Sequence, residues 1–342
     1  MDEKMNKKSI GLSRRVANKW FWPLRAPFSY AVIDLGSRTL KCEILTQGLK
    51  RVAYIDEKVR LAGQNNPGYL DAEKIDVVLK TIQTWLQECD DLKIPHNHIS
   101  IVATEAIRKA KNQNVLLEGY QKLNSKIPLT VLTHEQEAYY GAMGALIHLS
   151  KSSDPLRGVI YVVEMGGASM QLSYVENQNS QSLKNLKSFL FDAFGVEHIR
   201  HQVASFSENY ALALKQTEDY LRAHSKFSQL QQVKSDQKKI LVLTGGTFWK
   251  MRDLMIEKHF QSSIEQEIDL EAFQKLALKI NTGSYEEIKN FVQNEFNEVE
   301  SFLIGVKTLQ GLLEVLKPQR LMTGAGALRH GIALKMMKKN AI

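Results

Sequence analysis

Two 14-residue segments of the chain align with each other without gaps, and this internal repeat constrains the fold more than any other feature. The first is VIDLGSRTLKCEIL from Val32, and the second is VVEMGGASMQLSYV from Val162. Each consists of an apolar strand ending in a carboxylate, a glycine turn with a hydroxyl residue, and a second strand of alternating pattern. The repeat therefore predicts two related β-hairpins, each with a polar bend.

The two polar bends are suited to binding an anion. Asp34 and Glu164 are the carboxylates that end the first strands, and Gly36 and Gly166 open the turns. Glycine lets the backbone approach a ligand closely, and successive N–H groups at such a bend form a concave anion site. We expect the two bends to face one another across a cleft.

Two further glycine turns follow apolar strands in the second half of the chain. Ile240 to Leu243 leads into Thr244-Gly245-Gly246-Thr247, and Arg320 to Met322 leads into Thr323-Gly324-Ala325-Gly326. Both read as strand, glycine turn and helix. The first N–H groups of a helix lack partners within it, and the helix dipole favours negative charge there. A single such turn is more often plain turn geometry, but four in one chain predict phosphate binding.

Helical patterns fill most of the remaining chain. They run from Asp71 to about Glu88, onward from Glu105, from about Glu135 to His148, from Asn209 to Leu221, from Leu270 to Ile280, and from Glu286 to Leu316. These segments show spaced apolar positions with charged faces. A length of 342 residues favours two domains over one. We expect an α/β protein whose second half is rich in helix.

Composition excludes several classes of protein. A hydrophobic content of 44% allows an ordinary globular core. The longest apolar runs fall far short of the roughly 18 residues that a membrane-spanning helix requires. Cys42 and Cys89 are the two cysteines and provide no disulfide framework. We expect a cytoplasmic protein that is not integral to a membrane.

Basic residues are concentrated near the N-terminus. Residues 1 to 28 hold seven lysines and arginines against Asp2 and Glu3, a balance of +5 within a net charge of +8. The apolar run at Trp20 to Trp22 is too short for a signal-peptide core. We interpret this segment as a flexible arm that folding does not require; contact with anionic lipid or a polyanion is the alternative. No recognised nucleic-acid motif accompanies it, so nucleic acid is not the expected partner.

The repeat and the turns resemble the exopolyphosphatase and guanosine pentaphosphate phosphatase family, within the actin, sugar kinase and heat-shock chaperone superfamily. The resemblance covers roughly residues 29 to 335. It is carried by AVIDLGSRT from Ala31, EKVRLAG from Glu57, VATEAIRKAKN from Val102 and LTHEQEAYYGAMGA from Leu132. It implies two actin-like (ribonuclease H-like) α/β domains with a ligand cleft between them, as in the short form of the family. Domain I would cover 29–134 with the C-terminal helix 326–342, and domain II 135–325.

The resemblance implies roles for individual residues. Glu137 holds the place of the catalytic carboxylate, and Arg108 that of an arginine that faces the phosphate. Asp34 and Glu164 would hold Mg²⁺. Phosphate would bind at the glycine turns, on Gly36, Ser37, Arg38, Gly166, Gly167, Ser169, Gly245, Gly246 and Thr247.

The chain departs from the family pattern at positions near this expected site. Arg38 replaces an asparagine, Glu164 an aspartate, and Gln171 a glutamate that helps the metal and water site in the family. The last change removes a negative charge, so the affinity of the site for a hard cation should be weaker. On this reasoning the enzyme is slow with Mg²⁺, and Gln171→Glu raises its rate.

The resemblance implies a hydrolase that releases terminal phosphate from polyphosphate, guanosine pentaphosphate or both. Water would attack the terminal phosphorus, with Glu137 as general base and Mg²⁺ neutralising charge. One alternative is a regulatory protein that binds polyphosphate or guanosine penta- or tetraphosphate with weakened catalysis. Another is a sugar or acetate kinase, against which the glutamate segment and the C-terminal arginine segment argue. The preferred substrate stays open, as does the formation of a homodimer.

Overall fold

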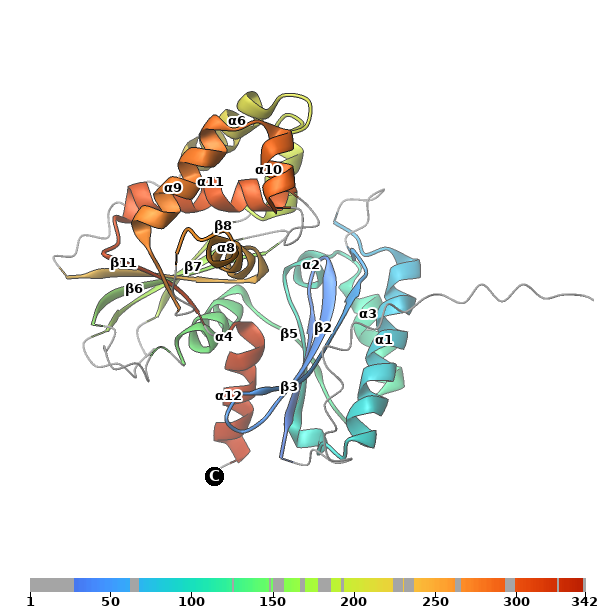
Figure 1. Cartoon of the computed structure of the whole chain (residues 1–342). Coiled ribbons are helices and arrows are strands. Elements are labelled where there is room, and N and C mark those ends of the chain that lie inside the picture. The colour runs from blue at the N-terminus through green and yellow to red at the C-terminus, as the bar shows by residue number, and fades with distance from the viewer. Residues whose placement is uncertain are drawn as a thin grey trace, which may run out of the picture.

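The computed structural model describes residues 28–61, 68–124, 126–147, 149, 157–166, 170–177, 186–191, 194–223, 230, 237–261, 266–292, 299–324 and 326–340. Apart from Phe28, the predicted basic arm at residues 1–28 lies outside these residues. The described chain forms two β-sheets covered by helices (Figure 1), which confirms the predicted α/β class.

The first sheet has five strands in the order β3-β2-β1-β4-β5. The first copy of the repeat forms the antiparallel hairpin β1–β2, as predicted, and β3 extends it. On the other side, β1 runs parallel to β4, and β4 runs parallel to β5. The strands are β1 (Tyr30–Leu35), β2 (Thr39–Leu45), β3 (Arg51–Lys58), β4 (Ile99–Ala103) and β5 (Leu129–Val131).

The second sheet repeats this arrangement. Its order is β10-β11-β9-β6-β7-β8, so that β8-β7-β6-β9-β11 match β3-β2-β1-β4-β5 in order and direction. The second copy of the repeat forms the hairpin β6–β7, and β10 adds an antiparallel edge strand. The strands are β6 (Gly158–Met165), β7 (Met170–Asn177), β8 (Lys187–Phe191), β9 (Lys239–Thr244), β10 (Glu267–Ile268) and β11 (Arg320–Thr323).

Helices on the outer side of the first sheet bury its hydrophobic face. They are α1 (Ala72–Asp91), α2 (Glu105–Lys109) and α3 (Gln113–Leu123). The short 3₁₀ helix η1 (His96–His98) precedes β4 and contacts α12. Figure 1 places α1 and α3 along this outer face. Asp71 caps α1, because its side chain accepts a hydrogen bond from the backbone N–H of Glu73. The predicted helix from Asp71 is thus confirmed.

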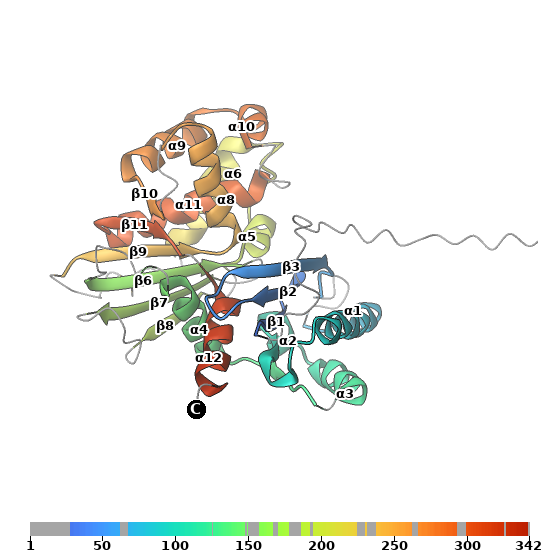
Figure 2. The ribbon, with the colours of Figure 1, turned by 60° about the horizontal axis from the view of Figure 1, so that its bottom comes forward.

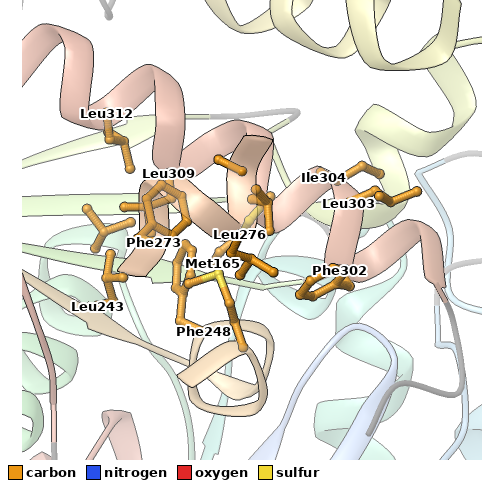
Figure 3. Close-up of a cluster of buried hydrophobic side chains, with 14 of the residues drawn as sticks. Met165, Leu243, Phe248, Phe273, Leu276, Phe302, Leu303, Ile304, Leu309 and Leu312 are labelled. Carbon is orange, nitrogen blue, oxygen red and sulfur yellow. The ribbon is translucent and has the colours of Figure 1, made fainter. Parts of the chain in front are cut away.

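The outer side of the second sheet carries a larger helical layer. It comprises α5 (Val196–Gln202), α6 (Tyr210–Ala223), α8 (Gly246–Glu257), α9 (Leu270–Thr282), α10 (Tyr285–Val292) and α11 (Val299–Leu316). Figure 3 shows Phe248, Phe273 and Phe302 packed beside Met165 and Leu243 of the sheet. The segment predicted as one helix from Glu286 to Leu316 contains two described helices, α10 and α11. None of the helices in the described ranges has the length and apolar character needed to cross a membrane.

Two helices, α4 (His134–Leu146) and α12 (Leu328–Asn340), lie side by side between the sheets (Figures 1 and 2). A Cβ atom added to Gly331 of α12 would overlap the backbone of Tyr140 in α4, and one added to Gly144 of α4 would overlap the backbone of Ala327, just before α12. The two helices therefore cross in backbone contact. Residues of α4 pack against strands of both sheets. The predicted domain boundary at residues 134–135 therefore falls on a shared element and stays a prediction.

Candidate active site

A pocket of about 380 Å³ lies between the two hairpin bends and the α4–α12 layer. Most of the predicted site residues line it. From the first hairpin come Asp34, Gly36, Ser37 and Arg38; from the second Glu164, Gly166 and Gln171; from α4 Glu137; and from α8 Gly246 and Thr247. The structure thus brings together residues that are up to 213 positions apart, between Asp34 and Thr247.

Four predicted site residues are not among those that line the pocket. Gly245 is the N-cap of α8, with a φ of 103° that favours glycine, and a Cβ atom added there would lie 3.1 Å from the backbone oxygen of Met165. Arg108 lies behind Glu137, to which it is bonded. Gly167 and Ser169 lie outside the described residues.

The alternation of side chains along β1 directs Asp34 toward α12. Tyr30 and Val32 pack in the cluster that contains α12, and Asp34 lies on the same face, two residues further on. There, Arg329 of α12 donates from Nη1 to Asp34 Oδ2 at 3.1 Å and from Nε to Glu43 Oε2 at 2.8 Å. Both carboxylates are buried, so one guanidinium joins the first sheet to the C-terminal helix.

The same alternation along β6 directs Glu164 toward α4. Ile160 and Val162 pack against that helix, and Glu164 follows on their face. Burial raises the pKa of Glu164 to about 7, and the negative charges of Glu137 and Asp34 add to the effect. A Cβ atom added to Gly141 would lie 2.6 Å from Glu164 Oε2. The glycine therefore leaves the space on α4 that the carboxylate occupies.

Glu137 lies in the first turn of α4, and its side chain is only 12% exposed. Arg108 Nη1 donates to Glu137 Oε2 at 2.8 Å, and Gln171 Nε2 donates to Glu137 Oε1 at 3.2 Å. Burial raises the pKa of Glu137 to about 6 against the opposing charge of Arg108, and nearby Asp34 and Glu105 raise it further. The arrangement provides a mostly buried carboxylate that is largely ionised at neutral pH and able to accept a proton.

A model of the Ppx/GppA phosphatase family matches residues 42–340, which is most of the chain. The chain belongs to the Ppx/GppA phosphatase family. Two guanosine-5'-triphosphate,3'-diphosphate pyrophosphatases, from Vibrio vulnificus and Photobacterium profundum, are 27% and 26% identical to it over 316 and 330 residues. These matches cover 91% and 92% of this chain but 59% and 61% of the two relatives. The chain therefore spans about three fifths of their length.

Solved structures of the Ppx/GppA family have the same fold. A family member from Aquifex aeolicus matches with a TM-score of 0.71 at 20% identity, covering 92% of this chain and 99% of that one. An exopolyphosphatase from Cytophaga hutchinsonii matches with a TM-score of 0.70 at 16% identity, covering 91% and 98%. The predicted pair of actin-like domains is confirmed at the level of the fold.

Sequence reasoning assigned no role to several residues of this Ppx/GppA pocket. Basic side chains also line it, and they are partly buried or exposed: Lys41, Lys58, Arg60 and Lys250. Lys41 occupies the position of the repeat that corresponds to Gln171, and Lys58 and Arg60 lie in the EKVRLAG segment. The repeat and that segment therefore contained a signal for three of these residues, and none for Lys250.

Glu105 is the fourth carboxylate of the pocket, beside Asp34, Glu137 and Glu164. It is 6% exposed, and its Oε1 accepts a hydrogen bond from Lys109 at 2.6 Å. Its Oε2 is buried and has no hydrogen-bond partner within the described part of the chain. The inner part of the pocket is therefore acidic, whereas the more exposed lining residues are basic.

The carboxylates suit a magnesium ion that is carried in part by the substrate. Over the described ranges, no group of three or more histidine, cysteine, aspartate or glutamate side chains is placed to hold a metal ion. Mg²⁺ is commonly bound by one or two carboxylates together with water and substrate phosphates. Asp34 and Glu164 are two such carboxylates, and their mutual repulsion with Glu137 is the kind that a cation relieves. The donor set thus fits Mg²⁺ with phosphate oxygens as further ligands.

Proposed function

We propose that this chain is a phosphoanhydride hydrolase that releases terminal phosphate from polyphosphate, guanosine pentaphosphate or both. The observation that carries the proposal is Glu137, a mostly buried carboxylate with a pKa of about 6 that lines the pocket and is bonded to Arg108. A base whose pKa lies close to the operating pH is both ionised and strong enough to take a proton from water. Membership of the Ppx/GppA family and the names of the relatives support the same class of reaction.

The distribution of charge in the pocket supports a polyanionic substrate with a defined orientation. The more exposed Lys58, Arg60 and Lys250 attract the phosphate chain at the mouth. The terminal phosphate then reaches the bends at Gly36 and Gly166, where backbone N–H groups bind its oxygens. The acidic inner part faces this terminal group, so hydrolysis proceeds from the end of the chain.

The residues at the inner end have different roles in the displacement at the terminal phosphorus. Glu137 takes a proton from a water molecule as that water attacks the terminal phosphorus. The bond from this phosphorus to the bridging oxygen breaks, and the bridging oxygen keeps the electron pair as part of the shortened chain. The N–H groups of the bends stabilise the charge on the transferred group. Mg²⁺, when bound to Asp34, Glu164 and phosphate oxygens, supplies further neutralising charge.

A second candidate is a regulatory protein that binds polyphosphate or guanosine penta- or tetraphosphate with weakened catalysis. This candidate is favoured because two of the site residues are already bonded to other side chains of the protein. Arg108 is bonded to Glu137, and Asp34 is bonded to Arg329. A protein that keeps these pairs when the ligand binds would retain the phosphate-binding bends without the freedom to catalyse.

Phosphate release separates the two candidates. The assay compares polyphosphate and guanosine pentaphosphate, with and without Mg²⁺, for wild type, Glu137→Gln and the control Glu135→Gln. Glu135 lies in the same helical turn but does not line the pocket. Loss of a general base should lower turnover about 10² to 10⁴-fold while binding persists. Equal, residual release by wild type and Glu137→Gln, with both binding polyphosphate, would replace the hydrolase with the regulatory protein.

A further inference from the structure

The carboxylate of Glu137 is bonded at both of its oxygens, and the two donors differ in kind. Arg108, a cation on α2, holds Oε2, whereas Gln171, a neutral amide on β7, holds Oε1. Gln171 is only 5% exposed. A buried amide fixed at one end by a strand has few alternative rotamers, so its contact orients the carboxylate as well as stabilising it.

The position of Gln171 follows from the hairpin register. It lies directly opposite Glu164 across β6 and β7, on the sheet face that packs against α4. The negative charge of Glu137 raises the pKa of Glu164, and Asp34 raises the pKa of both carboxyl groups. A neutral donor can stabilise ionised Glu137 without adding another negative charge to this group.

We propose that Gln171 is a positioning residue for the general base. Its Nε2–H fixes one oxygen of Glu137 while Arg108 fixes the other, so that the plane of the carboxylate is set and its remaining lone pairs are available to the water in the pocket. The inference rests on the proposed hydrolase function and assigns Gln171 a role in that same site. It acts through Glu137 and need not touch the substrate.

This contact reverses the expectation for Gln171→Glu that the family pattern suggested. A glutamate at this position would place a second carboxylate against Glu137 Oε1, in place of the amide donor at 3.2 Å. Like charges at that distance favour sharing of one proton, which raises the pKa of the pair. The base would then be protonated at neutral pH, and turnover would fall.

Steady-state kinetics as a function of pH and Mg²⁺ concentration tests the proposal with wild type, Gln171→Glu and Gln171→Met. Ser173→Ala is the matched control, because Ser173 is buried on the same face of β7 but does not line the pocket. Loss of one hydrogen bond to a charged group should lower kcat roughly tenfold in Gln171→Met, with KM changed less than about twofold. In Gln171→Glu the acidic limb of the pH profile should move up by about 1 pH unit.

A higher kcat for Gln171→Glu than for wild type at any Mg²⁺ concentration would overturn the proposal. A kcat for Gln171→Met equal to that of wild type would do the same. The proposal also falls if Ser173→Ala reproduces the loss, because the effect would then belong to packing of the strand.

A thermal-unfolding cycle tests the contact without using activity. Wild type, Gln171→Met, Glu137→Met and the double variant are compared; the Arg108 contact is lost in both proteins that lack Glu137 and cancels. The Tm changes should be non-additive by roughly 2 °C. If the wild-type protein releases phosphate but the Tm changes are additive, only the inference about Gln171 is overturned. If the Tm changes are non-additive but the wild-type protein releases no phosphate, the hydrolase function is wrong, and with it the catalytic role of the contact.

Discussion

The two copies of the internal repeat place a carboxylate at the same point of the same hairpin but give it different surroundings. In the first copy Asp34 lies opposite Lys41 and is bonded to Arg329. In the second copy Glu164 lies opposite Gln171, and its pKa is raised to about 7. One carboxylate is neutralised by a buried cation, whereas the other is held in a region of excess negative charge.

The helix that each hairpin faces accounts for the difference. The first hairpin faces α12, which supplies Arg329 to both Asp34 and Glu43. The second faces α4, which supplies a glycine and a further carboxylate, Gly141 and Glu137. The repeated local sequence therefore sets the backbone of both bends, while residues far away in the chain set the electrostatic surroundings of each carboxylate.

Removing Arg329 should take away the buried cation of the first hairpin and have the largest effect on stability. Arg329→Met leaves Asp34 and Glu43 buried with one cationic partner fewer. Breaking one partner out of a buried ion pair typically costs about 3–5 kcal/mol. Urea denaturation at pH 7 measures the loss.

The control for this change is Arg222→Met, which removes an exposed arginine paired with Glu218 and Glu314. Exposed pairs of this kind contribute less than about 1 kcal/mol. A loss for Arg329→Met as small as that of the control would show that the buried network does not anchor α12 to the first sheet.

Neutralising Glu164 should change how the stability of the protein depends on pH. The pKa of Glu164 is raised in the folded protein, so folding binds extra protons between the ordinary carboxylate range and pH 7. Stability therefore falls as pH rises through this window. Glu164→Gln should remove that term and stabilise the protein by about 1–3 kcal/mol at pH 8, with little gain at pH 4. Equal stability changes at both pH values in urea titrations would contradict the raised pKa.

The contribution of Glu43, in the first hairpin, to stability should depend on pH in the opposite direction. Burial acts to raise its pKa, but Arg329, His330 and Arg51 outweigh burial and lower it. Its contribution to stability is therefore present at neutral pH and is lost as pH falls below the ordinary carboxylate range. As the pH falls, Glu164 therefore stabilises the folded protein, whereas Glu43 destabilises it.

Filling the space at Gly141 should disturb the second hairpin without unfolding α4. A Cβ atom there would displace Glu164 Oε2, whereas alanine within a helix is intrinsically favoured over glycine by about 1 kcal/mol. We expect Gly141→Ala to lower kcat roughly tenfold while the Tm stays within about 2 °C.

The double variant Gly141→Ala, Glu164→Asp provides the matched rescue. Aspartate is one methylene shorter and withdraws its oxygens from the added methyl group. Recovery of turnover relative to Gly141→Ala would support the steric account. A double variant that is slower still would indicate that Gly141 acts in another way.

The local part of the fold was predictable from the sequence, because strand, turn and helix patterns are short-range. The repeat predicted both hairpins, and the glycine turn at Gly245 predicted the start of α8. The pocket residues on these bends followed from the same signals. Where Glu137, on α4, lies relative to them depended on the family resemblance, since nothing in its own segment fixes that position.

The partners that tune the site were not predictable from local pattern. Asp34 and Arg329 are 295 positions apart, and the sequence around each shows no sign of the other. The sequence marks Gln171 only as a departure from the family glutamate, and its hydrogen bond to Glu137 emerges only from the structure. Gly141 was one of several small residues in a helical segment. Its proximity to Glu164 emerges only when the sheet packs on α4.

Exchanging the register partner in the first hairpin should have the smallest effect and tests how far the two bends are independent. Lys41→Gln gives the first copy the residue that the second copy has opposite its carboxylate. Lys41 is partly buried, lines the pocket, and acts to lower the pKa of Glu164. Its loss therefore removes one positive charge from the substrate path and raises the pKa of Glu164 slightly. Because interactions with partly solvated charges are screened by salt, we expect KM for polyphosphate to rise about two- to fivefold at low ionic strength and less at 0.5 M salt, with kcat nearly unchanged. Steady-state phosphate release at two salt concentrations measures both parameters. A fall in kcat larger than the rise in KM would show that Lys41 acts at the reacting end of the pocket, and the bends would then have to be treated as one electrostatic unit.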